Sequence, residues 1–355
     1  MSRPSTFGFL PCNKSRGMTS RDVVNHVQRR LQLELGISRL KVGHTGTLDP
    51  LADGMVIVAV GPATRLTPWM LKVNKRYRGV FQIGVSSTSG DLEEPVTRHS
   101  DLPMPGVAQL QSAVDSLHGW IDQIPPAHSA VWVDGQRAYE RTRRGETVDM
   151  PTRRVWVEQI ELVDYQPPNF VIDVVCGSGT YLRSLGIDLA ARCGTVAVMT
   201  SLTRTAIGTL RLEDAAPTED YQTPPLRLLD EHQKARLASP SGTRLLDQLR
   251  EPAQMLGHLS QMQLTSDEVS RVRNGLCVDR NPLPVSMARE KSESMRSESV
   301  VGTPDNPFHG DNLDDVYAKE SLGDAAAMDP QGRLVAIMRE KRGSWCPYRV
   351  FPGPI

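Results

Sequence analysis

The sequence has no apolar run of the roughly 20 residues that a helix needs to span a bilayer, so no membrane-spanning protein is predicted. Its first residues, MSRPSTFGFLPCNKSRGMTS, lack the apolar stretch and cleavage site of a secretory signal, which favours the cytoplasm. No two cysteines have the close spacing typical of a structural zinc site, although distant residues could still assemble one. We expect no metal, and we expect reduced thiols at Cys12, Cys176, Cys193, Cys277 and Cys346.

The chain also has no net charge at pH 7, because its 41 basic side chains are balanced by 41 acidic ones. The distribution is nevertheless uneven: residues 1–90 hold thirteen basic and four acidic side chains, a net +9 that the rest of the chain offsets. Such asymmetry is typical of a polyanion-binding face, with a set of solvated side chains as an equal alternative. The basic residues are Arg3, Lys14, Arg16, Arg21, Arg29, Arg30, Arg39, Lys41, Arg65, Lys72, Lys75, Arg76 and Arg78.

The order of secondary structure along the 355 residues predicts a mixed fold. Apolar residues recur at helical spacing over 19–35, where Ser20 is placed to cap a helix and Gly36 to end it. Because strands and helices alternate without a regular βαβ period, we predict an α+β fold with a mixed sheet. Further patterns indicate strands over 55–60, 76–85 and 171–176 and a helix over 181–192.

Two polar segments look inserted into this pattern. Residues 215–243 are rich in Pro, Ser, Thr and charge, and residues 284–325 are polar and turn-rich, so we expect the second segment to be mobile. A helical stretch is predicted over 244–259, and a strand pair follows the second segment. The sequence therefore predicts two domains, 1–243 and 244–355, of which the second is small and rich in β-structure.

The most informative segment for chemistry is 41–54, which reads KVGHTGTLDPLADG and leads directly into a predicted buried strand. Three glycines and a proline make it an irregular loop, the kind of segment in which chemistry concentrates. It holds a single central carboxylate, Asp49, followed by Pro50. From spacing alone, a turn in which Asp49 hydrogen-bonds its own backbone is favoured. The glycine–lysine pattern of phosphate-binding loops is missing.

Residues 43–66 closely resemble the central motif of the TruB family of tRNA pseudouridine-55 synthases, in the form GHTGTLDPLADGMVIVAVGPATRL. The resemblance continues in order along most of the chain. Taken singly, the short matches KRY at 75–77 and L-x-R at 202–204 are weak evidence for the family. The GHTGTLDP loop at 43–50, followed in order by GTYLR at 179–183, is a specific match. The matching segments are GFLPCNKSRGMTS at 8–20, KRY at 75–77, QIPPAHSA at 123–130, GQRAYE at 135–140, CGSGTYLRS at 176–184 and SLTR at 201–204.

The resemblance implies a mixed-sheet pseudouridine synthase core followed by a small, β-rich, PUA-like C-terminal domain. It also implies that uridine 55 in the T-loop of tRNA is isomerised to pseudouridine. This reaction breaks the C1′–N1 bond, rotates uracil and rejoins it through C5, so no cofactor is expected. A uridine inside a folded hairpin must be flipped out of the stack first. The expected partner is tRNA, through its T-arm and possibly its acceptor stem, and the protein is expected to act as a monomer.

The resemblance also assigns roles to individual residues. Asp49 falls on the catalytic carboxylate, which can act at C6 of the base, at C1′ of the sugar or through a glycal route. Arg183 is implied as the cation that keeps Asp49 charged in a largely dry pocket. Tyr77 is implied to stack on the flipped base and to serve in proton transfer, with core packing as the alternative. Leu202 is implied to line the uracil pocket, and His44 to contact displaced nucleotides.

Phosphate contacts are expected from basic residues near these motifs, interleaved with Tyr139 and Trp156, although a solvated face is the alternative. The opening motif departs from the family, because it reads Asn13-Lys14-Ser15 instead of Asp-Lys-Pro. We expect a shifted loop there rather than a lost function. The expected phosphate contacts are Lys14, Arg16, Arg65, Arg137, Arg141, Arg143, Arg144, Arg153 and Arg154.

Two other functions are compatible with parts of the pattern. A guide-RNA-dependent rRNA pseudouridine synthase of the dyskerin type shares the TLDP loop, but residues 123–146 resemble the bacterial tRNA enzymes more. A non-catalytic RNA-binding or folding factor is the other alternative. Such a protein would need none of Asp49, Tyr77 and Arg183, so their joint presence favours an enzyme.

Overall fold

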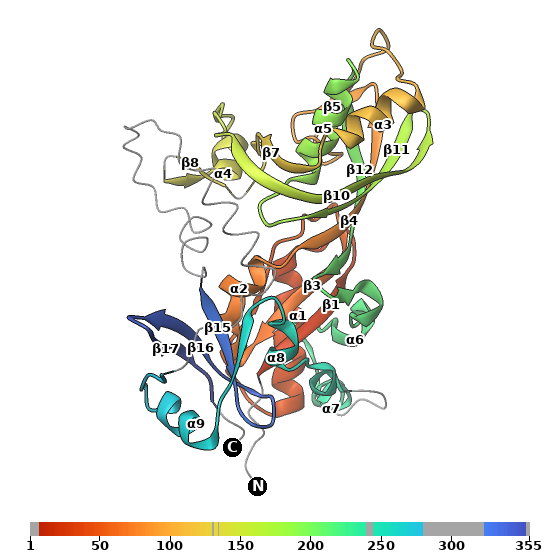
Figure 1. Ribbon diagram of the computed structural model, residues 1–355. Coiled ribbons are helices and arrows are strands. Elements are labelled where there is room, and N and C mark those ends of the chain that lie inside the picture. Colours follow the sequence, from red (N-terminus) through yellow and green to blue (C-terminus); the bar gives the residue numbers. More distant parts are fainter. Residues whose placement is uncertain (1–6, 130, 134, 239–243, 280–322, 353–355) are drawn as a thin grey trace.

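The computed structural model describes residues 7–129, 131–133, 135–238, 244–279 and 323–352. Figure 1 shows a long curved sheet with helices around it and a small second sheet beside one end. The strand order of the large sheet is β1-β3-β12-β4-β11-β10-β7, with β2 added to β3 and β13 added to β12. The sheet is mixed, because β12 pairs with β3 in parallel and with β4 antiparallel. The predicted α+β class is therefore confirmed.

The bounds of the elements agree with most sequence predictions. The strands of the large sheet are β1 (Gly8–Lys14), β2 (Val42–His44), β3 (Asp53–Val60), β4 (Lys75–Ile83), β7 (Gly119–Gln123), β10 (Arg153–Gln166), β11 (Asn169–Cys176), β12 (Ala197–Ile207) and β13 (Leu210–Arg211). Two small hairpins are β5 (Val85–Ser87) with β6 (Val96–Arg98), and β8 (Trp132–Val133) with β9 (Gln136–Arg137). The helices of this part are α1 (Ser20–Leu35), α2 (Thr67–Leu71), α3 (Val107–Asp115), α4 (Ala138–Arg143), α5 (Leu182–Arg192), α6 (Thr218–Tyr221) and α7 (Glu231–Ala238).

Helix α1 begins one residue earlier than the sequence suggested. Thr19, not Ser20, is the N-cap, and it forms a capping box in which Thr19 and Asp22 bond each other's backbone amides. Gly36 ends the helix in the left-handed conformation, with φ 63°, as predicted. The Ser20 side chain is consequently free for a different contact, described below.

Helix α5 packs closely on the centre of the sheet. Phe81 of β4 stacks on Phe170 of β11, with ring centroids 5.1 Å apart, inside the main core cluster. Gly186 of α5 lies directly over this pair, because a Cβ added there would stand 2.0 Å from Phe81 Cε1. Only glycine allows this approach, which brings α5 close to the sheet at Gly186.

The segment 215–243, expected as an insert, is in its first part built into the domain. Tyr221 is fully buried, and its hydroxyl donates to the Asn13 carbonyl at 2.7 Å. The Asn13 amide donates to the Ala216 carbonyl at 2.8 Å, and the hydroxyls of Ser15 and Thr218 are 2.8 Å apart. Of the two residues that depart from the family's opening motif, Asn13 therefore contacts this segment through its backbone and Ser15 through its hydroxyl. Residues 239–243 lie outside the described residues.

The single helix predicted over 244–259 is wrong. The chain instead forms a 3₁₀ turn, η4 (Leu245–Gln248), and one turn of helix, α8 (Pro252–Met255). Between them, Arg250 exchanges two backbone hydrogen bonds with Phe9 of β1, at 2.7 and 2.9 Å. Pro252 cannot continue a preceding helix, and extended pairing with β1 satisfies the backbone instead. Leu245 packs in the same core cluster as residues of α1, so the chain just after the expected boundary at 243/244 still contacts the first domain, and that boundary remains a prediction.

The C-terminal domain is small and rich in β-structure, as predicted. Its four strands are β14 (Ser260–Gln263), β15 (Asp324–Met328), β16 (Leu334–Lys341) and β17 (Ser344–Val350), in sequential order, with helix α9 (Ser266–Arg273) beside them. The predicted mobile segment 284–325 lies outside the described residues up to 322. Its last two residues, Asp324 and Ala325, belong to β15, so that predicted boundary is wrong.

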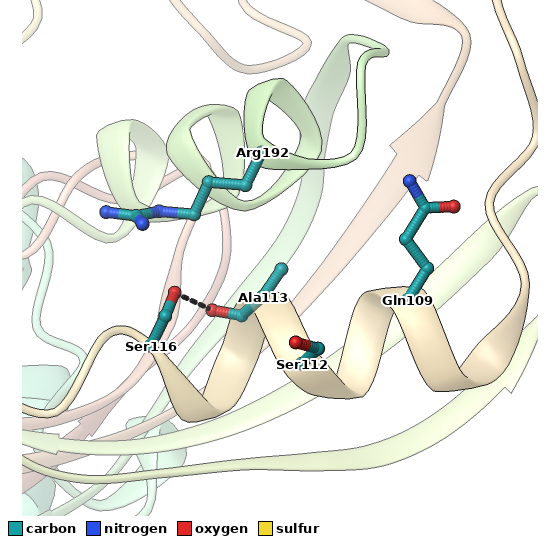
Figure 2. A pocket seen from close by; sticks show the side chains of 5 residues that line it. All are labelled: Gln109, Ser112, Ala113, Ser116 and Arg192. Carbon is teal, nitrogen blue, oxygen red and sulfur yellow. Dashed lines mark hydrogen bonds between the residues drawn. The ribbon is translucent and has the colours of Figure 1, made fainter.

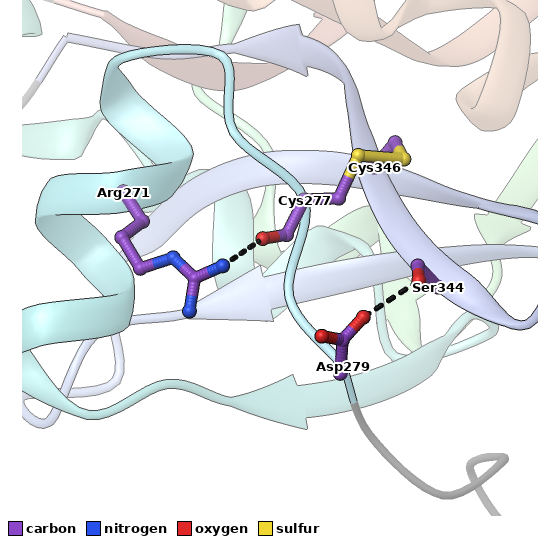
Figure 3. Close-up of a disulfide and its surroundings, with 5 residues drawn as sticks. All are labelled: Arg271, Cys277, Asp279, Ser344 and Cys346. Atoms are coloured by element: carbon purple, nitrogen blue, oxygen red, sulfur yellow. Dashed lines mark hydrogen bonds between the residues drawn. A yellow bond between two sulfur atoms is a disulfide. The ribbon is translucent and has the colours of Figure 1, made fainter.

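The expectation of five reduced thiols is wrong for two of them. Cys277, which follows α9, and Cys346 of β17 form a disulfide (Figure 3). Backbone bonds between the neighbouring residues Val278 and Trp345 hold the two segments together. At a sequence separation of 69, these cysteines could not be paired from sequence spacing. Cys12, Cys176 and Cys193 are free and buried. None of the helices among the described residues has the length and apolar content required to cross a membrane.

Candidate active site

The predicted motifs meet at the centre of the large sheet. Strand β12 lies between β3 and β4, so that Arg204 is opposite Gly54 on one side and Tyr77 on the other. Leu202, two residues earlier on β12, is opposite Gly79. Three segments therefore come together at the centre of the sheet. They are the loop of residues 41–54, which leads into β3, the KRY segment of β4 and the SLTR segment of β12.

Asp49 and Arg183 form the ion pair that the sequence predicted. Arg183 Nη2 is 3.1 Å from Asp49 Oδ2. The Arg183 side chain is only 5% exposed, and it also donates to the carbonyls of Ser89 and His128, at 2.9 and 3.0 Å. The pocket is not dry in the free protein, because the Asp49 side chain remains 37% exposed. One charge of the pair is thus fixed and buried, whereas the other faces solvent and an incoming substrate.

A second carboxylate, Asp91, supports Arg183 from the opposite side. Asp91 Oδ2 lies 3.4 Å from Arg183 Nη1, and its side chain is 1% exposed. Its Oδ1 accepts the Ser89 hydroxyl at 2.5 Å and the Glu93 amide at 3.0 Å. Burial of a guanidinium is unfavourable without paired charge, and Asp91 supplies that charge while Asp49 stays open. Sequence reasoning missed Asp91, because SSTSGDLEE has the composition of an exposed polar turn.

Arg204 fixes the backbone before Asp49. It is 1% exposed, and it donates to the carbonyls of Gly46 at 3.3 Å, Thr47 at 3.1 Å and Met55 at 2.6 Å. A buried guanidinium requires several acceptors, and an irregular loop offers carbonyls that no helix or strand uses. Gly54 allows the approach, since a Cβ there would stand 2.4 Å from the Arg204 carbonyl oxygen.

Ser20 and Lys14 fix the backbone around and after Asp49. The Ser20 hydroxyl donates to the Leu48 carbonyl at 3.1 Å and accepts its amide at 2.8 Å. Lys14 is fully buried, and its ammonium donates to the carbonyls of Met18, at 2.8 Å, and Ala52. The expected phosphate contact of Lys14 is therefore wrong. Burial lowers its pKa to about 8, while Asp53 and Asp49 oppose that shift.

Tyr77 and Leu202 provide apolar side chains beside the 41–54 loop. Both belong to or pack against the main core cluster, and Leu202 is 6% exposed. The Tyr77 hydroxyl is 3.5 Å from Arg204 Nη1. Burial raises the pKa of Tyr77, so the phenol stays neutral near pH 7 and its ring can stack on a base.

His44 is the last residue of β2, in the first part of the 41–54 segment. Its Nδ1 is buried and has no hydrogen-bond partner among the described residues. Burial lowers its pKa, with smaller contributions from the nearby cations Arg21 and Arg204. The ring is therefore neutral near pH 7, and it can offer an uncharged donor and acceptor to an RNA base.

Comparison with known proteins shows the family to which the chain belongs. Residues 31–182 match the TruB family pseudouridylate synthase N-terminal domain. Over 352 residues, the chain is 42% identical to the tRNA pseudouridine synthase B of Rhodopirellula baltica, which covers 98% of this chain and 95% of that relative. The chain belongs to the TruB family. The resemblance noted in the sequence is confirmed, and the protein is a pseudouridine synthase, an isomerase.

Other similar proteins agree with this membership. The tRNA pseudouridine synthase B of Geobacillus kaustophilus is 35% identical over 276 residues, which cover 76% of this chain and 89% of that protein. Among solved structures, a Cbf5-Nop10-Gar1 complex superimposes with a TM-score of 0.63 and 21% identity, over 98% of this chain and 84% of the other. An H/ACA RNP bound to a substrate RNA gives 0.61 and 19%, over 98% and 86%. At such identities the structures show a shared fold.

The other basic residues that were expected to contact RNA differ in how far contacts within this TruB-family enzyme already engage their side chains. Arg16 is exposed, and it donates a long hydrogen bond of 3.5 Å to the Thr200 carbonyl. Arg65 instead contacts the C-terminal domain, where it donates to the Val350 carbonyl at 2.8 Å and lies 4.8 Å from the Phe351 ring centroid. A phosphate contact from Arg65 therefore remains a prediction, and it would require the guanidinium to leave its contacts with Val350 and Phe351.

Several arginines around α4 lie over aromatic rings. Arg137 lies 4.8 Å from the Trp132 ring centroid, and Arg143 lies 5.5 Å from that of Tyr139. Arg141 is paired with Glu146 at 2.9 Å. Trp132, which sequence reasoning did not single out, is 39% exposed. Phosphate contacts by these arginines remain predictions. Arg144 also pairs with Glu146, and Arg154 lies over Trp120.

A shallow hollow elsewhere on the molecule is lined by Gln109, Ser112, Ala113 and Ser116 of the α3 region and by Arg192 of α5 (Figure 2). Arg192 is at the opposite end of α5 from Arg183, about 14 Å away along the helix axis at 1.5 Å per residue. The hollow is thus separate from the Asp49 site. Among the described residues, no group of three or more His, Cys, Asp or Glu side chains could hold a metal ion.

Proposed function

We propose that this TruB-family enzyme converts uridine 55 in the T-loop of tRNA to pseudouridine, with Asp49 as the reacting carboxylate. The carrying observation is a partly exposed carboxylate 3.1 Å from a buried guanidinium, on a loop whose backbone is held by hydrogen bonds at Thr47 and Leu48 before Asp49 and at Pro50 after it. Such preorganisation suits a group that must meet one atom of an extruded nucleotide. The names of the relatives, tRNA pseudouridine synthase B, support tRNA as the substrate.

The proposed steps use the residues as the structure arranges them. The flipped uracil stacks on the Tyr77 ring beside Leu202, and Asp49 acts at C6, at C1′ or through a glycal route. Cleavage of the C1′–N1 bond frees the base, which turns and rejoins the sugar through C5. Arg183 pairs with the Asp49 carboxylate at 3.1 Å, and the RNA itself completes the desolvation of that pair. In the last step C5 loses its proton, and N1, freed from the sugar, takes up a proton, so that the overall reaction is an isomerisation.

RNA recognition is proposed to involve the surface around this site. The neutral His44 ring contacts displaced T-loop nucleotides, and the exposed arginines near α4 contact phosphates and stack on bases. The C-terminal domain reaches towards the acceptor stem. We propose that the chain acts alone as a monomer, in the cytoplasm and without a cofactor.

The guide-RNA-dependent alternative is not favoured. It draws on the likeness to the H/ACA complexes, but at 19–21% identity that likeness concerns the fold. The relative at 42% identity is named for tRNA.

The test is an assay of the purified protein on a bare T-arm hairpin without guide RNA. We expect one pseudouridine, at the position of U55, and none when cytidine replaces that uridine. Full-length tRNA is assayed in parallel. Absence of product in both RNAs, or product only after a guide RNA is added, would contradict the proposed substrate.

A further inference from the structure

We infer that Ser89 is a positioning residue, which keeps the Arg183 guanidinium shared between Asp91 and the reacting carboxylate, Asp49. The inference rests on the proposed function, because it assumes that Asp49 is the reacting group. Ser89 lies in the turn between β5 and β6, outside every motif that the sequence analysis singled out, and it is 1% exposed. It acts through its neighbours rather than on the substrate, because its contacts are with Arg183 and Asp91.

The two terminal nitrogens of Arg183 have matching surroundings. Nη1 donates to the Ser89 carbonyl at 2.9 Å and lies 3.4 Å from Asp91 Oδ2. Nη2 donates to the His128 carbonyl at 3.0 Å and lies 3.1 Å from Asp49 Oδ2. Each nitrogen thus has one backbone carbonyl and one carboxylate as neighbours, and the two carboxylates share a single cation.

The two carboxylates alone would not favour this sharing. The Asp91 side chain is 1% exposed and that of Asp49 is 37% exposed, and attraction between charges is weaker where solvent screens it. A guanidinium also pairs most strongly when two of its N–H groups meet both oxygens of one carboxylate. If Asp91 presented both of its oxygens, Arg183 would turn towards it and away from Asp49.

The Ser89 hydroxyl prevents this two-oxygen pairing. It donates to Asp91 Oδ1 at 2.5 Å, and the Glu93 amide donates to the same oxygen at 3.0 Å, so both acceptor positions of Oδ1 are filled. The alternative acceptor for this hydroxyl is the Asp91 carbonyl, which is farther away at 3.3 Å and already accepts the Ser87 hydroxyl at 2.6 Å. Asp91 therefore faces Arg183 with Oδ2, which has no hydrogen-bond partner among the described residues.

The test compares Ser89→Ala, Ser89→Thr and the matched control Ser86→Ala in single-turnover assays on the T-arm hairpin, with RNA affinity measured alongside. Ser89→Ala keeps the backbone carbonyl that Arg183 uses, but it removes the hydroxyl and opens one acceptor position of Asp91. The chemical step should slow by on the order of tenfold, the loss expected for a hydrogen bond to a charged group, with affinity changed less than about threefold.

The other two variants separate this role from a general effect on the turn. Ser89→Thr keeps the hydroxyl and should recover most of the rate. Ser86→Ala removes the same group from the same hairpin, where it contacts His99 at 2.8 Å, and should match the wild type. A Ser89→Ala rate equal to that of the control would overturn the inference, as would a Thr variant as slow as the Ala variant.

Crystal structures of the wild type and of Ser89→Ala provide a readout that needs no activity. In the variant, Arg183 should lie closer to Asp91 and farther from Asp49, and unchanged distances would also overturn the inference. If the Ala variant does not fold, Ser89→Cys takes its place in both measurements, because a thiol is a weak donor. If the wild type modifies no hairpin, the proposed function fails, and the two structures still decide whether Ser89 sets the position of Arg183.

Discussion

Three buried cations surround the Asp49 loop, and their acceptors differ. Lys14 and Arg204 donate to backbone carbonyls of the loop, whereas Arg183 is the one of the three within ion-pair distance of carboxylates. The first two therefore set the shape of the loop, and Arg183 sets the charge that Asp49 experiences. The sequence shows three basic residues in motifs that resemble those of the family, and only their burial and their acceptors distinguish these roles.

At the residue scale, we predict that Arg183→Ala lowers the single-turnover rate by about 100-fold or more, with RNA affinity changed far less. The change leaves Asp91 buried without its cation, and breaking a buried pair costs about 3–5 kcal/mol. Arg183→Lys should recover only part of the rate, because an ammonium cannot reach both carboxylates as a planar fork does. An Ala variant with near wild-type turnover would mean that the Asp49–Arg183 pair has no catalytic role.

A second residue-scale prediction concerns pH. Burial lowers the folded-state pKa of His44 below its unfolded value of about 6.5. The neutral ring therefore contributes stability that is present above pH 6.5 and is lost as the pH falls through the folded pKa. The drop in Tm between pH 7.5 and pH 5.5 should be smaller in His44→Gln than in the wild type. Equal drops in the two proteins would contradict the inferred environment of His44.

At the element scale, the close approach of α5 to the sheet is a testable feature. Gly186→Ala should destabilise the protein by about 1–3 kcal/mol or more, because the new Cβ overlaps the Phe81 ring. Displacement of α5 should also move Arg183 and lower the turnover rate. Gly106→Ala is the matched control, since an added Cβ there meets nothing within 4 Å. Thermal unfolding measures both variants, and equal Tm values would contradict the packing described.

Elements with a strong local pattern were predictable from the sequence, and elements fixed by distant partners were not. The buried strand β3 and helix α5 follow from apolar runs and helical spacing. The stretch after residue 244 has apolar residues at helical spacing, but pairing with Phe9 and the stop at Pro252 override that pattern. Local periodicity contains no information on such tertiary pairing.

The candidate site divides in the same way. The resemblance located Asp49, Tyr77 and Arg183, and the structure brings their motifs together. It could not locate Asp91, since burial of a carboxylate in a polar turn leaves no local signal. Lys14 was misplaced for the opposite reason, because a basic residue in a basic segment suggests a surface contact.

At the scale of the whole molecule, the two domains share one core. Phe9, Met55 and Trp69 of the first domain pack in the same cluster as Ile337 and Phe351 of the second. The Trp69 indole donates to Asp324 at 3.1 Å, and Arg65 donates to the Val350 carbonyl. The C-terminal domain is therefore fixed against the first domain by apolar and polar contacts together.

The basic excess of residues 1–90 is smaller at the surface than in the sequence. Lys14, Arg30 and Lys75 are buried, at 0%, 7% and 6% exposure. Lys14 and Lys75 donate hydrogen bonds to backbone carbonyls, and Arg30 forms an ion pair with Glu34. The polyanion-binding face therefore remains a prediction that depends on the exposed cations alone.

The disulfide leads to a prediction about stability. Reduction, or the double change Cys277→Ser and Cys346→Ser, should destabilise the C-terminal domain by about 2–4 kcal/mol, because the cross-link restricts the unfolded chain. Thermal unfolding with and without a reductant measures the effect. The reductant should lower the Tm of the wild type and leave that of the double variant unchanged. A wild-type Tm that is insensitive to reductant would show that the bond contributes nothing.

The central claim is that a TruB-family fold uses Asp49 to isomerise one uridine of tRNA. The most direct measurement maps pseudouridine in full-length tRNA incubated with the wild type or with Asp49→Asn, with RNA affinity determined for both. We predict one pseudouridine, at position 55, with the wild type and none with the Asn variant, at affinities within a few fold because phosphate contacts elsewhere carry binding. Turnover by an Asn variant shown to be free of deamidation would contradict the account.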